Sequence, residues 1–140
     1  MIQRKQTLWL LLSTISSALT FKFPFFTGTV LPNTKGVTGP DLSAVDNIFL
    51  ILLTVVTLAL ALVAIFLFKD RKRQVQLTIL GLLCAVGLIA LYFLYVKNFA
   101  PGGHLTLTAL LTLFIVIGFF FAMKGIRKDQ KLIRDLNRLR

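Results

Sequence analysis

Few side chains in this sequence are able to carry out chemistry. It holds one histidine, His104, one cysteine, Cys84, and no glutamate. One imidazole and one thiol cannot complete a metal site, a haem ligand pair or a Cys-His nucleophile, and no glycine-rich phosphate loop is present. We therefore expect no enzymatic activity, no cofactor and no bound metal.

Two carboxylates, Asp41 and Asp46, lie close together and could be taken for ligands of a cation. A hard cation such as calcium takes about six to eight oxygen ligands, and no further spaced oxygens accompany this pair. The segment 43–46 instead fits a capping box, in which the Ser43 hydroxyl and the Asp46 carboxylate accept hydrogen bonds from free amides. We therefore predict a helix start here rather than a cation site.

The charged residues are strongly segregated along the chain. It carries 16 Lys/Arg and five Asp, a net charge of +11. Of the 16 basic residues, 13 fall in three blocks, at positions 4–5, 69–73 and 124–140. Basic blocks that alternate with long apolar runs are typical of the positive-inside rule of membrane proteins. The charge therefore indicates topology, and nucleic-acid binding is not expected.

The elements between these blocks are apolar runs, and 56% of the chain is hydrophobic, against about 45 to 50% in soluble domains. The runs 48–68 and 75–96 contain no charge, and the run 105–123 is 19 residues long. A helix of about 20 apolar residues spans the roughly 30 Å hydrocarbon core of a bilayer. The sequence therefore predicts transmembrane helices over these three runs.

A further apolar segment, 7–26, follows a short basic and polar lead that includes Arg4 and Lys5. A basic lead before an apolar stretch is also typical of a secretory signal peptide. Residues 16–18 form only a weak cleavage site, however, and apolar character resumes at Phe21. We therefore predict an uncleaved first span over 7–26.

The topology follows from the basic segments, because positively charged loops stay in the cytoplasm. The turn 69–73 carries four Lys/Arg and is placed inside, which leaves 27–45 as the main external loop. Glycine, proline and asparagine are so dense in this loop that we expect neither helix nor sheet there. The prediction is one all-α polytopic membrane domain over 1–140, with four transmembrane helices and both termini cytoplasmic.

Small residues recur on one face of each predicted span. Lipid offers no hydrophobic drive between helices, so their association depends on close van der Waals approach of such residues. The alternative is that the hydroxyls line a path for a polar solute, but Ser and Thr ordinarily bond back to their own helix carbonyls. The predicted packing residues are Ser13, Ser17, Thr54, Ala61, Gly81, Ala85, Gly118 and Ala122.

The last segment, 124–140, is predicted to be a C-terminal amphipathic helix. Its apolar residues fall on one side of a helical wheel and its basic residues on the other. Seven basic and two acidic residues give it a charge of +5. We expect it to lie along the inner leaflet against anionic lipid headgroups; the alternatives are docking to a membrane or cytoplasmic protein, and a solvated continuation of the fourth helix. The predicted membrane-surface or partner contacts lie in the turn 69–73 and in this tail, and are Lys69, Arg71, Lys72, Arg73, Lys124, Arg127, Lys128, Lys131, Arg134, Arg138 and Arg140.

The two ends of the chain resemble a known family. The opening MIQRKQTL and the closing RKDQKLIRDLNRLR are similar to a family of small four-helix membrane proteins of Bacteroidetes. That family carries only a domain-of-unknown-function label, DUF4293. The resemblance implies the inner membrane of a Gram-negative cell and supplies no catalytic residues. It also implies that function lies on the cytoplasmic face rather than in the loop 27–45.

The function that these observations favour is that of a structural or interaction module with a basic cytoplasmic face for lipid or a partner. The alternative is a small transporter or an accessory subunit of a membrane complex. A transporter is expected to hold a polar, water-accessible cavity near the midplane, whereas an interaction module should be densely packed there. No span carries a charge in its central part, which disfavours a proton-coupled carrier.

Overall fold

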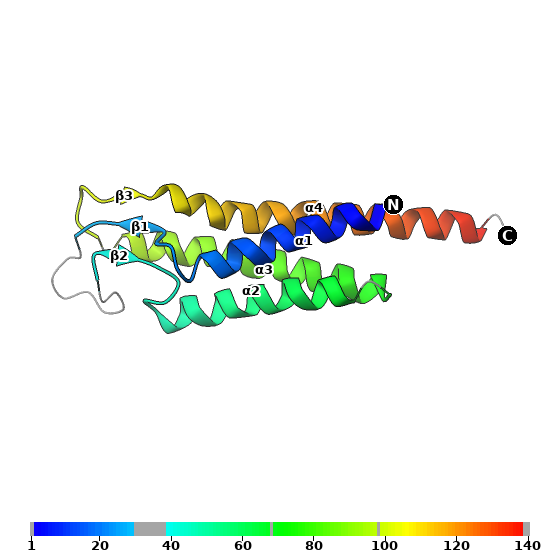
Figure 1. Cartoon of the computed structure of the whole chain (residues 1–140), viewed down its shortest axis with the longest axis horizontal. Helices are drawn as coiled ribbons and strands as arrows, with labels where there is room; N and C mark the ends of the chain where they lie inside the picture. The colour runs from blue at the N-terminus through cyan, green and yellow to red at the C-terminus, as the bar shows by residue number, and fades with distance from the viewer. Residues whose placement is uncertain (1, 30–38, 68, 98, 139–140) are drawn as a thin grey trace.

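The computed structural model describes residues 2–29, 39–67, 69–97 and 99–138, and of residues 2–4 only the backbone. Its four helices lie along the long axis of the molecule (Figure 1). Helix α1 packs against α4 and α2, and α3 packs against the same two helices from the other side. The prediction of an all-α fold is confirmed. The helices are α1 (Ile2–Leu19), α2 (Ile48–Phe66), α3 (Arg71–Val96) and α4 (Leu110–Arg138).

Within the described part of the chain, three helical segments are long and apolar enough to cross a membrane, judged by length and composition. They are α2, α3 and Leu107–Arg138, which joins the short 3-10 helix η1 (Leu107–Ala109) to α4. Helix α1 is not among them, because the polar residues 3–6 fill its first turn.

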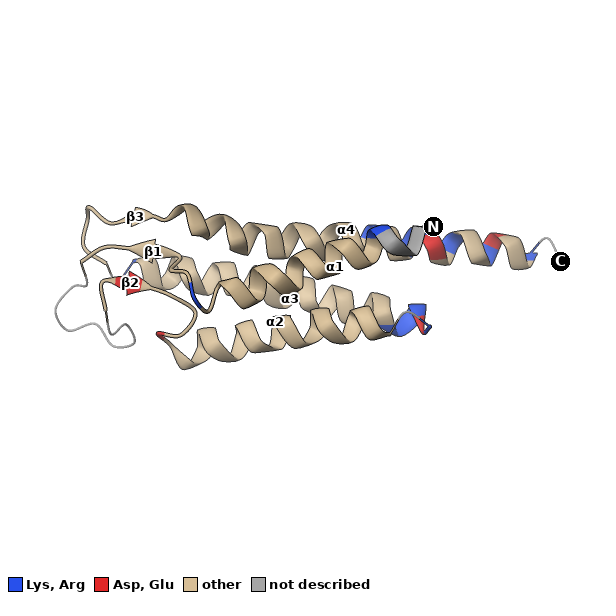
Figure 2. Ribbon diagram, in the orientation of Figure 1, with Lys and Arg blue, Asp and Glu red and all other residues tan. Residues whose placement is uncertain are grey.

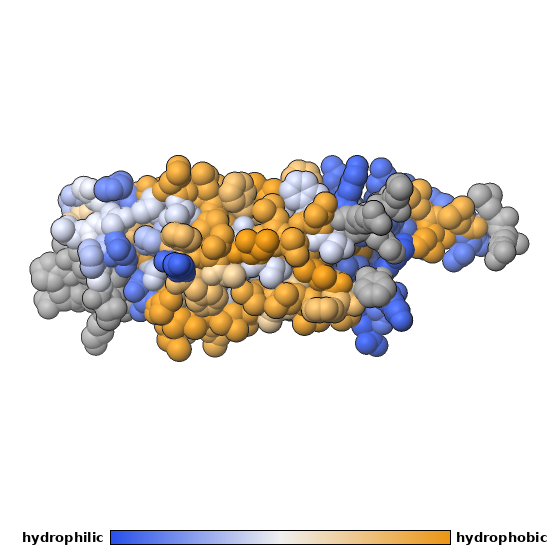
Figure 3. All heavy atoms as spheres, in the orientation of Figure 1, coloured by the Kyte–Doolittle hydropathy of each residue, from blue (hydrophilic) through white to orange (hydrophobic). Residues whose placement is uncertain are grey.

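Many large apolar side chains cover the outside of the helices, and inside them small residues lie beside large ones such as Phe119 and Leu88. Leu83 is 65% exposed and Phe66 is 74% exposed, whereas Thr54, Ala61 and Ala122 are fully buried. On the face shown in Figure 3, exposed apolar residues form a belt over the middle of the molecule, between two more hydrophilic regions. Such an arrangement is typical of helices in a membrane. Their small residues let the helix backbones approach closely, and their large apolar residues face lipid.

The first helix is shorter than the predicted span 7–26. Helix α1 ends at Leu19, and the Lys22 amide still donates to the Leu19 carbonyl in a final turn. Pro24 follows, and proline has no amide to donate and disfavours helical backbone before it. The chain therefore leaves the helix and continues in extended form.

A small antiparallel sheet closes this end of the molecule, so the prediction of a loop without sheet was wrong. Its strands are β1 (Phe26–Thr27), β2 (Asp41–Leu42) and β3 (His104–Leu105), in the order β2-β1-β3. Phe26 is the central residue and pairs with both Leu42 and Leu105. The remainder of the predicted loop, residues 30–38, lies outside the described residues.

Helix α2 begins at a different cap from the one predicted. Asn47 is the N-cap, and its side-chain oxygen accepts a 3.0 Å hydrogen bond from the Phe49 amide. The Ser43–Asp46 pair forms a turn just before the helix, where the Asp46 carboxylate accepts from the Ser43 amide. The capping-box residues thus shape the approach to α2 rather than its first turn.

Two helix boundaries also differ from the predicted spans. Helix α3 starts at Arg71, so most of the basic turn 69–73 is already helical. Helix α4 runs without a break from Leu110 to Arg138, so the predicted C-terminal helix is its direct continuation. Hydropathy decides where a helix is apolar, whereas backbone hydrogen bonding decides where it ends, and polar residues such as Arg and Lys are good helix formers.

Candidate functional site at the basic end

Lysine and arginine residues gather at one end of the helices, on the α2–α3 connection and on the last part of α4 (Figure 2). Arg71 is half-buried, and Arg140 lies outside the described residues. The fold therefore brings two basic segments, which are distant in the sequence, to the same end of the molecule. The other predicted contact residues are all exposed, namely Lys69, Lys72, Arg73, Lys124, Arg127, Lys128, Lys131, Arg134 and Arg138.

The α2–α3 connection is anchored by one buried amide. The Gln74 side chain is 6% exposed, and its Nε2 donates a 2.8 Å hydrogen bond to the Ala64 carbonyl near the end of α2. Arg73 Nε lies 3.6 Å from Asp70 Oδ2, but both side chains are mostly exposed, at 74% and 65%. Exposed ion pairs contribute little, so Gln74 holds the connection and leaves its cations available.

The α1–α4 contact contains a second buried polar pair. Gln6 Nε2 donates a 2.7 Å hydrogen bond to Asp129 Oδ2, and the two side chains are 6% and 5% exposed. Further along the same contact, the Ser13 hydroxyl donates to the Ile115 carbonyl at 3.0 Å. Among the described residues, Asp129 Oδ1 and Ser17 Oγ are buried without a hydrogen-bond partner.

The predicted packing residues all lie inside the helix assembly. Gly118 faces α1 so closely that an added Cβ would overlap Ser13 Oγ and lie 2.7 Å from the Trp9 carbonyl oxygen. An added Cβ on Gly81 would lie 2.6 Å from Cζ of Phe119. These contacts fill the middle of the molecule with direct helix–helix packing. The buried residues are Ser13, Ser17, Thr54, Ala61, Gly81, Ala85, Gly118 and Ala122.

A cavity of about 360 Å³ opens where the basic end of α4 meets α1. Trp9 and Phe121 form its aromatic part, and their rings stack with centroids 4.8 Å apart at 27°. The buried Gln6 side chain contributes the polar part, and three lysines also line the cavity. The cavity is lined by Lys5, Gln6, Trp9, Phe121, Lys124, Gly125 and Lys128.

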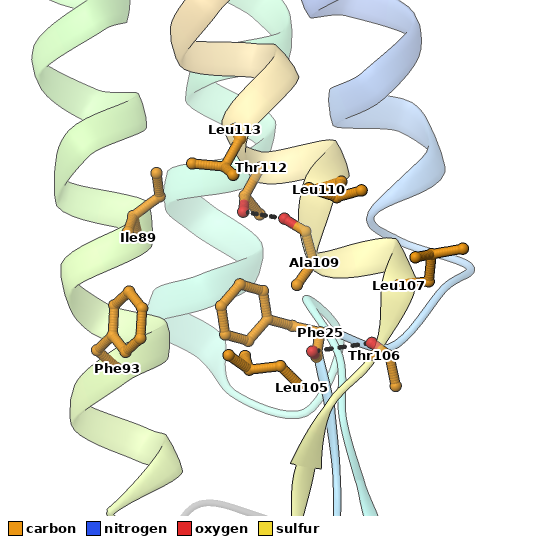
Figure 4. Close-up of a pocket in the computed structure, with 10 residues that line it drawn as sticks. All are labelled: Phe25, Ile89, Phe93, Leu105, Thr106, Leu107, Ala109, Leu110, Thr112 and Leu113. Carbon is orange, nitrogen blue, oxygen red and sulfur yellow. Dashed lines mark hydrogen bonds between the residues drawn. The ribbon is translucent and has the colours of Figure 1, made fainter.

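A second cavity of about 360 Å³ lies at the opposite end, between α3 and α4 above the sheet (Figure 4). Phe25, Phe93 and Leu113 are among its apolar walls. The hydroxyls at its edge already have partners, because the Thr106 hydroxyl lies within hydrogen-bond distance of the Pro24 and Phe25 carbonyls and Thr112 donates to the Ala109 carbonyl. This cavity offers apolar contact without a free polar group, so it has little means of selecting a ligand.

The chain matches the family described as domain of unknown function (DUF4293) over residues 2–139. The match spans nearly the whole sequence. The chain belongs to the DUF4293 family. Membership of the family that the two ends of the chain indicated is therefore confirmed. No curated protein and no solved structure matches the chain, so the chemistry of this DUF4293 protein must be argued from its own residues.

Gln6, Gln74 and Asp129 of this DUF4293 chain are structural residues that the sequence patterns did not predict. In the sequence, Asp129 is simply one of the two acidic residues of the basic tail. A helical wheel nevertheless places it within the apolar arc, between the directions of Leu136 and Ile133. A lone carboxylate on an apolar face signals a buried hydrogen bond, because buried polar groups are nearly always paired. The partner, Gln6, could not be named because it lies 123 residues away.

Proposed function

We propose that this DUF4293 protein is a four-span protein of a bacterial inner membrane, from Bacteroidetes, that acts as an interaction module. In this proposal both termini are cytoplasmic, and the end of α4 binds a partner protein. The span added to the three apolar helical segments described above is α1 together with residues 20–26, which form a final turn and then extended chain. This assignment is supported by the packing of α1 along α4 and by exposed apolar residues on α1, among them Leu8, Leu11 and Ile15.

The basic end supports the cytoplasmic placement of the termini. The first described residues of α1, the α2–α3 connection and the last part of α4 all lie at that end (Figures 1 and 2). Loops and tails rich in Lys and Arg are retained in the cytoplasm during insertion. One orientation therefore accounts for all three basic blocks.

The observation that carries the proposed function is that the α1-facing side of α4 continues beyond α1. Gly118, Gly125 and Asp129 face α1. Steps of three and four residues continue that row to Leu132 and Leu136, because such steps stay on one helix face. Leu132 is 44% exposed and Leu136 is 66% exposed. A surface built for helix packing is therefore left uncovered at the cytoplasmic end (Figure 1).

The basic residues on these turns indicate which kind of partner the leucine row would fit. Lys131, Arg134 and Arg138 are exposed along the same two turns. Lys131 is the nearest of the three to the leucine row, whereas Arg134 lies on the opposite side of α4. A partner helix or groove with an apolar strip and a carboxylate at its edge would cover the leucines and pair with Lys131. A second copy of this tail is a poor partner, because it would bring like charges together.

Continuity of α4 favours a protein over the lipid leaflet as the occupant. The sequence favours a tail that lies flat on the inner leaflet. For the tail to lie flat, α4 would have to bend near the end of the span. Helix α4 has no interruption there, and its tail extends along the helix axis, away from the apolar belt (Figure 3). Sharp bends in helices arise at prolines, bulges or inserted groups, and residues 124–138 contain no proline.

The transporter alternative receives less support from the packing. The middle of the molecule is filled where Gly118 meets Ser13 and Gly81 meets Phe119. A carrier would need a polar cavity at that level for its substrate. Both cavities described above lie instead toward the ends of the helices.

In vivo photo-crosslinking tests the tail as a docking surface. A photoreactive amino acid at Leu136 should yield a discrete protein adduct, whereas one at Arg134, on the opposite side of α4, should yield little. Adding Leu132→Asp should abolish the adduct at Leu136. The charge-matched control Lys131→Gln should weaken the adduct without removing it, because the apolar row is intact.

The identity of the adduct decides the proposal. A single protein species, identified by mass spectrometry and carrying acidic residues at the linked site, supports it. Adducts to phospholipid alone, or equal labelling from Leu136 and Arg134, would show that the tail has no specific protein partner.

A further inference from the structure

The cavity between the start of α1 and the end of the α4 span combines features that the proposed docking of the tail does not use. Lys124 and Lys128 are one helical turn apart on α4, and Lys5 reaches the same cavity from α1. All three side chains are exposed. Within the described residues, none of them forms an ion pair. Like charges held one turn apart on a helix repel each other, so an anion bound here would relieve that repulsion.

Among the described residues, the carboxylate beside this cavity is that of Asp129, and its Oδ2 is already bonded. Asp129 is buried and accepts a hydrogen bond from Gln6 Nε2. Gln6 in turn lines the cavity, and its Cγ lies 2.8 Å from where a Cβ on Gly125 would be. The absence of a side chain at Gly125 therefore leaves room for Gln6 in the wall. Among the described residues, three lysines line the cavity and one buried carboxylate lies beside it, so the net charge here is positive.

The aromatic side of the cavity matches the part of a lipid just below its phosphate. Trp9 and Phe121 stack with their ring centroids 4.8 Å apart, and Phe121 is 41% exposed within the apolar belt. Tryptophan prefers the boundary between headgroups and acyl chains, and lysines reach outward from that level. The cavity is thus apolar toward the membrane interior and cationic toward the headgroups.

We propose that this cavity binds the phosphate of an anionic glycerophospholipid. Lys5, Lys124 and Lys128 contact the phosphate, and the Trp9–Phe121 pair contacts the glycerol and the first acyl carbons. Each lysine near an anionic surface favours the anionic lipid about fivefold, equivalent to about 1 kcal/mol. The inference rests on insertion in a membrane but not on the protein partner of the tail, so each can fail alone.

Fluorescence quenching of Trp9 tests the site directly, because it is the only tryptophan in the sequence. The full chain is placed in phosphatidylcholine nanodiscs that contain an equal minor fraction of brominated phosphatidylglycerol or brominated phosphatidylcholine. Brominated phosphatidylglycerol should quench Trp9 several-fold more strongly. Lys124→Gln/Lys128→Gln should remove this preference. The charge-matched control Lys131→Gln/Arg134→Gln, on the tail beyond the cavity, should retain it.

The remaining outcomes overturn the proposal. Equal quenching by the two lipids means that the cavity does not select an anionic headgroup. Loss of preference in both variants means that overall charge, rather than this cavity, attracts the lipid. Inorganic phosphate added to discs of phosphatidylcholine alone should leave the Trp9 emission unchanged. A saturable change with phosphate would assign the site to a free anion instead.

Discussion

Gln6 and Asp129 form a 2.7 Å hydrogen bond between two buried side chains that are 123 positions apart. The bond joins the start of α1 to α4 just beyond the apolar belt. In the same register of α1 on α4, Ser13 meets Gly118, and Lys5 lines one cavity with Lys124 and Lys128. Both the proposed lipid site and the uncovered end of α4 depend on this register.

The first prediction concerns the Gln6–Asp129 bond. Gln6→Ala should lower the free energy of unfolding by roughly 1.5 to 3 kcal/mol, because it leaves a buried carboxylate without its donor. Thermal unfolding of the purified protein in detergent or nanodiscs measures this loss. The loss should shrink when Asp129→Asn is also present, because the uncompensated charge is then removed.

Asp135→Asn is the matched control for this experiment. Asp135 is an exposed carboxylate on the same helix, so its removal should leave the unfolding transition nearly unchanged. If Gln6→Ala were as stable as the parent protein, the bond could not set the α1–α4 register.

The second prediction compares two glycines. Gly118→Ala should destabilise the protein by about 1 to 3 kcal/mol, the usual range for overpacking, because its Cβ would overlap Ser13 Oγ. Gly87→Ala should be neutral or slightly stabilising, because its Cβ meets only Leu53 Cδ2 at 3.7 Å and alanine favours helix. Thermal unfolding measures both variants, and equal effects would contradict the observed packing.

The third prediction tests the four-span topology with single cysteines in a Cys84→Ala background. Asp41→Cys should react with a membrane-impermeant maleimide in intact spheroplasts, and Lys5→Cys and Lys72→Cys only after permeabilisation. Lys72 is a suitable site in this connection because its side chain is exposed, unlike that of the neighbouring Gln74. Labelling of Lys5→Cys in intact spheroplasts would place the start of α1 outside and reduce the number of spans to three.

The fourth prediction concerns the threonines that join the end of α1 to the start of α4. The hydroxyls of Thr106 and Thr108 both donate to the Pro24 carbonyl. Thr108→Val should cost little, because Thr106 still donates to that carbonyl. Adding Thr106→Val should cost about 1 kcal/mol more than the sum of the single effects, since the carbonyl then loses its last donor. A double-mutant cycle by thermal unfolding measures this coupling, and strict additivity would show that the two hydroxyls do not substitute for each other.

The sequence alone was sufficient for the helical class, for the apolar segments in α2, α3 and α4, and for the grouping of the basic residues. These features are local sums: twenty neighbouring apolar side chains make a membrane-spanning segment whatever the rest of the chain does. The family could also be named from the two ends of the chain. The packing residues were also predictable, because small residues that recur every three or four positions form one face of a helix.

Only the tertiary structure decided how distant segments meet. The strand β1 forms because Phe26 pairs with Leu42 and Leu105. A strand of two residues is too short to be recognised from its own sequence. The path of the chain after α1 depends on that sheet, and the cavity around Trp9 depends on how α1 packs along α4. Such contacts are set by the packing of residues that are far apart in the chain, and no local pattern of hydropathy or charge encodes their pairing.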